Sequence, residues 1–325
     1  MKKIFISTIP FSKASILPLD ILGSYGYEIV INPLGRKLQP GEINQFIGDV
    51  DGIIAGTELI DESALAIATN LKVISRVGIG LDGVDLSACK AKSIAVTYTA
   101  DAPAPAVAEL TVGLLINLIR FVHKMDKEVR SGGWSRPYGR RIAELKVGVI
   151  GVGRVGSRVI RRLSAFGTPE LYCHDLKINH DIDRNFKVKW CSKNDLVKLS
   201  DVILVHVPLT KKTENMISDY EFSMMKKDVV LINTARGGIV NETALHDFLL
   251  ENPDSSAAID VFEQEPYKGP LTKLENIILT SHVGSMTEDC RNRMEIEAVE
   301  SLVAFLESDD LVREVPEYEY INQQN

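Results

Sequence analysis

One short segment constrains the fold of this chain more than any other. The apolar run Leu145–Ile150 is followed at once by Gly151-Val152-Gly153-Arg154-Val155-Gly156 and then by a helical pattern from Ser157 to Phe166. Glycines at this spacing between a strand and a helix allow a tight turn, close approach of the backbone to a pyrophosphate, and close packing of helix on strand. The helix start also offers unpaired N–H groups and a favourable dipole to the phosphates. The segment therefore predicts a dinucleotide-binding unit.

The strand after this segment indicates which dinucleotide is bound. Leu171–His174 ends at Asp175, about 20 residues beyond the glycines, where a carboxylate hydrogen-bonds the ribose 2′-hydroxyl. Because the same carboxylate repels a 2′-phosphate, we expect NAD rather than NADP. Without the glycines, Asp175 would be an ordinary turn residue at a strand end.

Short β-branched runs alternate with helical patterns in both halves of the chain, which predicts an α/β protein with two doubly wound, Rossmann-like parallel sheets. In the first hundred residues the expected strands are Lys3–Ser7, Glu28–Asn32, Gly52–Ala55, Lys72–Arg76 and Ile94–Tyr98. In the second half they are Leu145–Ile150, Glu170–His174, Lys187–Trp190, Asp201–His206, Val229–Asn233, Ala257–Asp260 and Ile277–Thr280. A length of 325 residues with 45% hydrophobic residues fits two domains and excludes a disordered chain.

Two longer helical patterns stand apart from this alternation. Residues Pro103 to Arg130 predict one continuous helix whose apolar side chains, such as Leu110 and Leu114, fall on more than one face. We therefore expect it to be buried on several sides, as a crossover between domains or in the interface of a homodimer. A last helix is expected from about Glu288 to Leu306.

Charge and cysteine usage exclude several classes of function. The net charge of −7 argues against a nucleic-acid partner. The four cysteines are scattered without metal-ligand spacing, so we expect reduced thiols in a cytoplasmic protein and no metal site. The start of the chain predicts a first strand rather than a signal peptide. No apolar run approaches the roughly 20 residues that cross a bilayer, so no membrane span is expected.

Polar residues follow three of the later predicted strands, where ligands bind in open α/β sheets. His282 is a candidate acid or base near neutral pH, and Glu265 is a candidate to hold its imidazole and favour the protonated form. Arg236 offers a planar fork that matches a carboxylate. Each residue alone also has an ordinary structural explanation, as a loop histidine, a helix cap or a surface arginine. Their joint appearance behind a dinucleotide motif favours hydride transfer to or from a small acid.

With these residues the chain resembles the D-isomer-specific 2-hydroxyacid dehydrogenases, a family that includes D-3-phosphoglycerate dehydrogenase, formate dehydrogenase and D-lactate dehydrogenase. The resemblance covers nearly the whole chain. Besides the glycine segment, it is carried by Val77–Asp82 with Val84-Asp85, Val107–Glu109, His206–Thr210, Asn233–Gly238, Asp260–Phe262 with Glu265-Pro266, and Ser281–Gly284. Trp134, Ala235–Gly238 and the residues after His282 resemble the phosphoglycerate dehydrogenase branch most.

The resemblance implies an NAD-dependent oxidoreductase that transfers a hydride between the nicotinamide and C2 of a small D-2-hydroxy acid or 2-keto acid, with Arg236, Glu265 and His282 as catalytic residues. The substrate residues that it implies are Arg76, Val77, Gly78, Ile79, Gly80 and Arg236, with the N–H groups of Gly78 to Gly80 on the substrate carboxylate. The implied cofactor residues are Gly151, Gly153, Arg154, Val155, Gly156, Asp175, His206, Val207, Pro208, Thr213, Thr234, Ala235, Asp260, His282 and Gly284, with Asp260 facing the carboxamide.

The resemblance also implies a domain organisation. It predicts a flavodoxin-like substrate-binding domain that is split in sequence, residues 1–99 plus 286–325, and an NAD-binding Rossmann domain over residues 100–285. The helical segment after Pro103 resembles the family's dimerisation arm, which implies a homodimer. We expect no regulatory domain beyond Leu306.

Two departures from the family pattern leave the substrate open. Ala55-Gly56-Thr57 stands where phosphoglycerate dehydrogenases carry an Arg-Ser pair whose arginine helps to hold the phosphate, and Ala100–Pro105 departs from their Asn-Ala-Pro-x-x-Asn region. D-3-phosphoglycerate and an unphosphorylated acid such as glyoxylate or hydroxypyruvate therefore both remain candidates. A third hypothesis is a non-catalytic NAD sensor like the C-terminal-binding-protein corepressors, and the near absence of tails for partner docking speaks against it.

Overall fold

The structure is a computed structural model that describes residues 1–167 and 169–324. The chain divides into two compact units. Unit 1 comprises Met1–Pro103 with Ser285–Asn325, and unit 2 comprises Ala104–Gly284. Each unit contains a sheet of parallel strands, so the predicted fold class of two Rossmann-like α/β domains is confirmed. Residues 168 and 325, which fall in the predicted domain ranges 100–285 and 286–325, lie outside the described residues.

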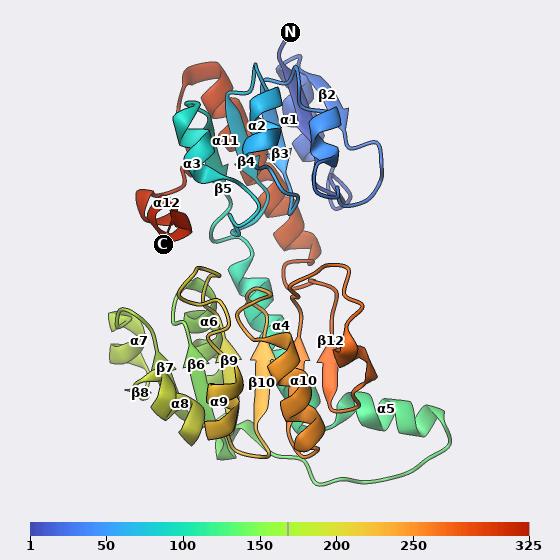
Figure 1. Ribbon diagram of the computed structural model, residues 1–325, viewed down its shortest axis with the longest axis vertical. Helices are drawn as coiled ribbons and strands as arrows, with labels where there is room; N and C mark the ends of the chain where they lie inside the picture. Colours follow the sequence, from blue (N-terminus) through green and yellow to red (C-terminus); the bar gives the residue numbers. More distant parts are fainter. Residues whose placement is uncertain (168, 325) are drawn as a thin grey trace. The chain divides into compact units, whose positions relative to one another are not determined.

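Unit 1 contains five strands in the order β2-β1-β3-β4-β5 (Figure 1). They are β1 (Lys3–Ile6), β2 (Glu28–Ile31), β3 (Gly52–Ala55), β4 (Val73–Arg76) and β5 (Ala95–Tyr98). The chain first adds β2 on one side of β1 and then adds β3 to β5 on the other side. The direction of winding therefore changes between β1 and β3, and ligands of such sheets bind at the carboxyl ends of the strands at this switch point.

Helices cover both faces of the unit 1 sheet, which explains why its strands are apolar on both sides. One face packs against α11 (Glu288–Ser308), which also contacts α1 (Leu17–Ser24). The buried hydroxyl of Ser75 in β4 donates to the carbonyl of Ala298 in α11. The other face packs against the short elements η1 (Glu42–Gln45), α2 (Glu62–Ile67) and α3 (Leu86–Ala91).

Unit 2 contains seven parallel strands in the order β12-β11-β10-β9-β6-β7-β8. They are β6 (Lys146–Ile150), β7 (Glu170–His174), β8 (Val188–Trp190), β9 (Val202–Val205), β10 (Val230–Asn233), β11 (Ser256–Ile259) and β12 (Ile277–Leu279). The winding reverses between β6 and β9, so the switch point of this sheet lies at their carboxyl ends. Every predicted strand of both units is present in the structure.

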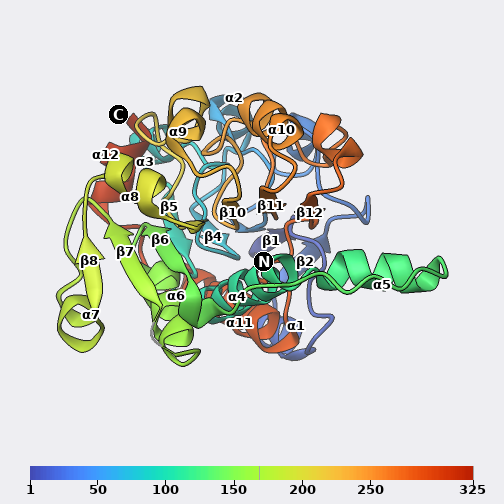
Figure 2. The ribbon, with the colours of Figure 1, turned by 90° about the horizontal axis from the view of Figure 1, so that it is seen from below.

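The helices of unit 2 form one layer on each side of its sheet, as Figure 2 shows. One layer contains α4 (Ala104–Ile119) and α6 (Arg154–Ser164). The opposite layer contains α8 (Lys193–Leu199), α9 (Asp219–Met224) and α10 (Glu242–Glu251). The remaining elements are α5 (Val122–Arg130), α7 (His180–Asn185), η2 (Ile142–Glu144) and η3 (Pro270–Lys273).

Two helix predictions were wrong. The continuous helix from Pro103 to Arg130 is instead two helices, α4 and α5, which meet at a bend of 59°. Phe121 between them has a left-handed φ of 57°, which ends α4. Most of α4 is buried as expected, but α5 has no buried residue and projects from the unit (Figure 1). The second error is α12 (Glu317–Gln324), a helix beyond the expected last one that packs against α3.

Among the described residues, no single helix is long and apolar enough to cross a membrane, and only the bent pair of α4 and α5 meets the criterion when the two are joined.

Candidate active site

The glycine turn lies at the carboxyl end of β6, at the switch point of unit 2. Gly151 has a φ of 91°, and a Cβ atom on it would lie 2.5 Å from the carbonyl oxygen of His206. A Cβ on Gly156 would lie 2.0 Å from the oxygen of Gly151. The first and third glycines are therefore required by close packing of the turn against the end of β9 and against α6.

Gly153 has a different environment. It is the residue before α6, and a Cβ on it would meet nothing within 4 Å. An open space thus borders the N-terminus of an eleven-residue helix, whose first N–H groups and dipole suit a pyrophosphate. Arg154 and Val155, two of the cofactor residues that the resemblance implies, form the first turn of this helix, which begins three residues before the predicted start at Ser157.

Asp175 is fixed beside the same turn. Its Oδ2 atom accepts the N–H group of Val152 at 2.6 Å, which joins the end of β7 to the glycine turn. The carboxylate has acceptor capacity left for ribose hydroxyls. The turn, the open space and this carboxylate together fit a dinucleotide.

His206 follows β9 on the other side of the switch point. Both nitrogens of its ring are buried, and neither has a hydrogen-bond partner among the described residues. Burial lowers the pKa of His206 to about 4, so the ring is neutral at physiological pH. Because buried polar groups are normally paired, this imidazole is ready to bond a ligand.

Five further predicted cofactor residues, Val207, Pro208, Thr213, Thr234 and Ala235, lie in loops of unit 2 after β9 and β10. The Thr213 hydroxyl donates to the carbonyl of Pro208 at 2.6 Å and thereby closes the loop that starts with Val207. The buried Thr234 hydroxyl lies 2.9 Å from that of Thr111 in α4. Thr111 was not predicted, because its role depends on the packing of a distant helix.

The three predicted catalytic residues follow three neighbouring strands. Arg236 comes after β10, Glu265 after β11 and His282 after β12, and these strands are adjacent and parallel. The sequence order alone could not show this adjacency, which comes from the sheet topology.

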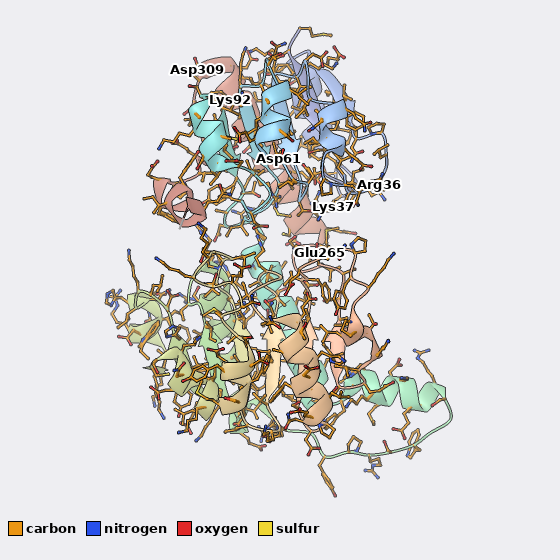
Figure 3. The ribbon with its side chains drawn as sticks, in the orientation of Figure 1. Arg36, Lys37, Asp61, Lys92, Glu265 and Asp309 are labelled. Atoms are coloured by element: carbon orange, nitrogen blue, oxygen red, sulfur yellow. The ribbon has the colours of Figure 1, made fainter. Side chains whose placement is uncertain are left out.

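Glu265 and His282 are in direct contact. The Nδ1 atom of His282 lies 2.9 Å and 3.1 Å from the two carboxylate oxygens of Glu265, which is labelled in Figure 3. The Glu265 carboxylate also accepts the N–H group of Phe262 at 3.3 Å. A carboxylate at Nδ1 orients the ring and favours a proton on that nitrogen, which leaves Nε2 for proton exchange with a substrate.

Asp260 organises the loop that carries His282. Its carboxylate is fully buried and accepts the Thr280 hydroxyl at 2.6 Å and the N–H groups of Val283 and Gly284 at 2.8 Å and 2.9 Å. Its backbone carbonyl accepts the N–H group of His282 at 2.8 Å. Sequence reasoning gave Asp260 only a cofactor role and missed this one. Three accepted bonds leave about one acceptor position for a ligand, since a carboxylate has roughly four.

Asn233 organises the loop that carries Arg236. Its amide donates to the carbonyl of Arg236 at 2.9 Å and accepts the N–H group of Ala235 at 3.0 Å. One Arg236 nitrogen donates to the Ala235 carbonyl at 2.6 Å. Asn233 was not among the predicted site residues, although an asparagine at a strand end is a known turn signal.

The predicted substrate residues of unit 1 follow β4. Arg76 is 5% exposed and donates to the carbonyl of Val77 at 2.5 Å. Gly78 has a φ of 133°, and its N–H group donates to the hydroxyl of Thr99 at 2.7 Å. In the described part of the chain, no hydrogen bond engages the N–H groups of Ile79 and Gly80. Of the three predicted carboxylate donors, these two therefore remain available.

Comparison with known proteins identifies the family. Residues 112–284 match the family model described as "D-isomer specific 2-hydroxyacid dehydrogenase, NAD binding domain". The chain belongs to the D-isomer-specific 2-hydroxyacid dehydrogenase family. It is accordingly an NAD-dependent enzyme of this family, and residues 112–284 of unit 2 are its NAD-binding domain. Among the described residues, no cluster of His, Cys, Asp and Glu has the geometry of a metal site.

Several members of this 2-hydroxyacid dehydrogenase family are similar to the chain. A glyoxylate reductase of Thermofilum pendens is 36% identical over 278 residues, which is 82% of each chain. A D-3-phosphoglycerate dehydrogenase of Methanocaldococcus jannaschii is 37% identical, but the match covers 77% of this chain and only 48% of that one. The crystal structure of D-lactate dehydrogenase from Aquifex aeolicus, complexed with NAD and lactic acid, has a TM-score of 0.83 at 28% identity and covers 95% of this chain and 96% of that one. Further relatives are a hydroxypyruvate reductase and other glyoxylate reductases.

Proposed function

We propose that this protein reduces a small, unphosphorylated 2-keto acid of the glyoxylate or hydroxypyruvate type with NADH, and catalyses the reverse oxidation of the matching D-2-hydroxy acid. The observation that carries the chemistry is the contact of His282 with Glu265, 2.9 Å apart, beside a dinucleotide site. Unit 1 serves as the substrate-binding domain, and unit 2 as the NAD-binding domain.

The choice of substrate rests on two observations. Most of the similar proteins are named for glyoxylate or hydroxypyruvate, whereas the phosphoglycerate dehydrogenase matches over only 48% of its length. In addition, β3 ends with Ala55 and continues with Gly56 and Thr57, so no cation stands at the position of the phosphate-binding arginine. Both observations favour the unphosphorylated substrate over D-3-phosphoglycerate, which resemblance of the motifs alone had favoured.

The proposed mechanism assigns the proton to His282. Bound NADH would supply the hydride for C2 of the keto acid. The Nε2 atom of His282 donates a proton to the keto oxygen during reduction and accepts it back during oxidation. The carboxylate of Glu265 holds the ring through Nδ1 and stabilises the imidazolium.

Binding of the substrate carboxylate falls to charged and backbone donors. In unit 2, the guanidinium of Arg236 is the donor that polarises the keto oxygen and bonds the carboxylate. In unit 1, the N–H groups of Ile79 and Gly80 are available to donate to a carboxylate. Asn233 and Asp260 are positioning residues, because they hold the loops of Arg236 and His282.

A panel of 2-keto acids tests the substrate class. Oxidation of NADH is followed by absorbance with glyoxylate, hydroxypyruvate, pyruvate and 3-phosphohydroxypyruvate. We expect the highest kcat/KM with glyoxylate or hydroxypyruvate. A preference for the phosphorylated acid would contradict the proposal, as would the absence of activity with every acid.

Replacement of His282 tests the mechanism. His282→Ala should lower the rate by roughly 10²- to 10⁴-fold with NADH binding largely kept, because the predicted cofactor contacts lie mainly at other strand ends. His246→Ala is a matched control, since His246 also pairs with a carboxylate, that of Asp247, at 2.9 Å. Near-normal turnover of His282→Ala would make His282 a structural loop residue.

We also propose that the protein is a homodimer. The helix α5 has no buried residue, and apolar side chains of this segment are exposed, 51% for Val122, 54% for Val129 and 80% for Trp134. Exposed apolar segments of this kind are typical of subunit interfaces. Sedimentation at micromolar concentration should give a dimer, and Val129→Asp should weaken it, whereas Ile67→Asp in unit 1 should not. A stable wild-type monomer would refute this proposal.

A further inference from the structure

The segment after α11 runs back along the edge of the unit 1 sheet. The N–H group of Tyr98 in β5 donates to the carbonyl of Arg313 at 3.1 Å, and the N–H group of Val315 donates to the carbonyl of Val96 at 3.1 Å. Val315 is 2% exposed and belongs to the core of the unit. Because β5 is the last strand in the order of the sheet, the segment covers this edge and leads the chain to α12 beside α3.

The helix α12 is attached to α3 mainly through an aromatic ring. Tyr320 packs against the core of unit 1, and the ammonium of Lys90 in α3 lies 5.4 Å from the centre of its ring. Lys90 also pairs with Glu317 at 2.8 Å, but these side chains are 61% and 67% exposed, so the ion pair adds little. A substitution further along α12 therefore keeps this attachment.

Gln323, near the end of α12, bonds three backbone groups of the loop between β4 and α3. Its Oε1 atom accepts the N–H group of Leu86 at 2.9 Å, and its Nε2 atom donates to the carbonyls of Val84 at 2.8 Å and Leu81 at 3.2 Å. Leu86 is the first residue of α3, and its N–H group has no acceptor within that helix. Both protons of the amide and its oxygen are thus used, a set of donors and acceptor that an aliphatic or charged side chain does not offer.

The loop fixed in this way contains two N–H groups, those of Ile79 and Gly80, that the described residues leave without a hydrogen bond. They directly precede Leu81. On their other side, the N–H group of Gly78 donates to the hydroxyl of Thr99 at 2.7 Å, and the Gly78 carbonyl accepts the N–H group of Thr99 at 3.2 Å. The two donors therefore lie between one attachment to the end of β5 and one to α12.

Other bonds hold the later part of the same loop, which limits the effect of losing the amide of α12. The N–H group of Ile60 donates to the carbonyl of Gly83 at 2.7 Å, and the N–H group of Asp85 donates to the carbonyl of Ile60 at 3.0 Å. The carbonyl of Leu81 also accepts the N–H group of Val84 at 3.0 Å. Loss of the amide would therefore loosen the turn without moving the whole loop from its place.

We propose that Gln323 is a positioning residue for the substrate carboxylate: it holds the turn Leu81–Leu86, and with it the direction of the Ile79 and Gly80 N–H groups before the acid binds. When donors are fixed in advance, binding does not include the free-energy cost of ordering them. The role acts on binding of the keto acid and not on the transfer of the proton or the hydride. The inference rests on the proposed function, because that function assigns a carboxylate to these two N–H groups.

Two substitutions at this position separate the hydrogen bonds of the side chain from its bulk. Gln323→Met keeps the length of the side chain without its donors and acceptor, and Gln323→Ala removes most of the side chain. With the best keto acid of the panel, we expect both to raise KM by about three- to tenfold, with kcat and the KM for NADH each within about twofold. Tyr318→Ala is the matched control, since Tyr318 is a 50% exposed residue of the same helix, and it should leave all three constants unchanged.

Hydrogen exchange of the loop gives a readout that does not depend on activity. The amide proton of Leu86 is bonded to Oε1 of Gln323, so a peptide that covers residues 79–86 should exchange faster in Gln323→Met than in the wild type. Peptides of unit 2 should exchange at the wild-type rate, as should the same loop peptide in Tyr318→Ala. An unchanged rate in Gln323→Met would show that the amide does not hold the loop, and the inference would be wrong.

The kinetic outcomes separate this inference from the proposed function. If the wild type reduces a keto acid and both Gln323 variants keep its KM, the inference is wrong and the proposed function stands. A rise of KM in Gln323→Ala alone would assign the effect to packing rather than to hydrogen bonds, which also contradicts the inference. So would an equal rise of the KM for the keto acid and for NADH, since that indicates a general loss of structure. If the wild type reduces no acid, the proposed function is wrong, and the inference falls with it.

Discussion

Both sheets of this protein change their direction of winding at a switch point, but the switch point of unit 2 is open and that of unit 1 is filled. In unit 2 the space at Gly153 is open, and His206 carries buried ring nitrogens without a partner among the described residues. In unit 1 the corresponding place is filled, because Glu58 bridges the loops after β1 and β3 and Gly56 has no room for a side chain. Topology thus determines where a ligand can bind, and a few local residues determine what is admitted.

Under the proposed function, this difference lets one architecture serve two ligands. A dinucleotide needs helix N–H groups and space for a pyrophosphate, which the start of α6 provides. A small keto acid needs only a few donors and a boundary that limits its size and charge. Under the proposed function, the filled switch point of unit 1 is suited to the second task.

Among the tests of this comparison, we expect the largest effect from His206 at the open switch point, on the free energy of unfolding. Its pKa is about 4 in the folded protein and near 6.5 when unfolded, so above pH 6.5 both states are neutral. As the pH falls from about 6.5 to 4, the unfolded chain takes up a proton that the folded chain refuses. The free energy of unfolding should therefore fall by up to about 3 kcal/mol from this residue.

Urea unfolding at a series of pH values measures this loss. The same series with His206→Gln isolates the contribution of His206 from that of other titrating groups, since the variant has no ionisable ring. We expect the two curves to converge toward acid pH. Parallel curves would show that the ring is solvated and that the switch point of unit 2 is not poised for a ligand.

A pair of glycine substitutions compares the two switch points directly. Gly56→Ala should destabilise the protein by about 1–3 kcal/mol, because its Cβ would lie 2.8 Å from Glu58 and 3.0 Å from Thr8. Gly153→Ala should leave the free energy of unfolding unchanged within about 1 kcal/mol, since its Cβ meets nothing within 4 Å.

For binding of NADH, we expect the larger effect from Gly153→Ala. Gly153→Ala should weaken it by about tenfold or more, as the new methyl group enters the space for the pyrophosphate, and Gly56→Ala should leave it unchanged. Thermal unfolding and fluorescence titration with NADH give both readouts. A Gly153→Ala protein that is destabilised but binds NADH normally would contradict both expectations for the open switch point.

The parts of the fold that sequence predicts are those that depend on local patterns. Every strand was found because most buried strands are short apolar runs between polar or turn-forming segments, and the glycine turn was found because its residues are contiguous. The break at Phe121 was missed because neither glycine nor proline marks it and the helical pattern continues on both sides. The helix α12 was missed because its docking depends on distant contacts, such as the bonds from Gln323 to the carbonyls of Leu81 and Val84.

In the candidate site, too, the residues that local patterns indicate were predicted and those that depend on distant contacts were not. Arg236, Glu265 and His282 were predictable as polar residues at strand ends, and their residue types suggest the chemistry. The positioning roles of Asn233 and Asp260 were not, because these residues act through bonds to loops whose course the sequence does not give. Glu58 belongs to the second kind, since its partner Ser7 lies after another strand.

The smallest expected effect concerns the cofactor preference at the open switch point. Asp175 accepts the N–H group of Val152 at 2.6 Å, so its carboxylate is held beside the glycine turn where the adenosine ribose of a dinucleotide is expected. A 2′-phosphate would then meet a fixed like charge, which costs on the order of 1.4 kcal/mol or more. We expect kcat/KM to be at least about tenfold higher with NADH than with NADPH.

Asp175→Asn keeps an acceptor for Val152 and removes the charge, so the preference for NADH should shrink while turnover with NADH is largely kept. Asp195→Asn, at an exposed position in the first turn of α8, is the control for a general change of charge. Equal kcat/KM values for the two cofactors in the wild type would mean that Asp175 only braces the glycine turn.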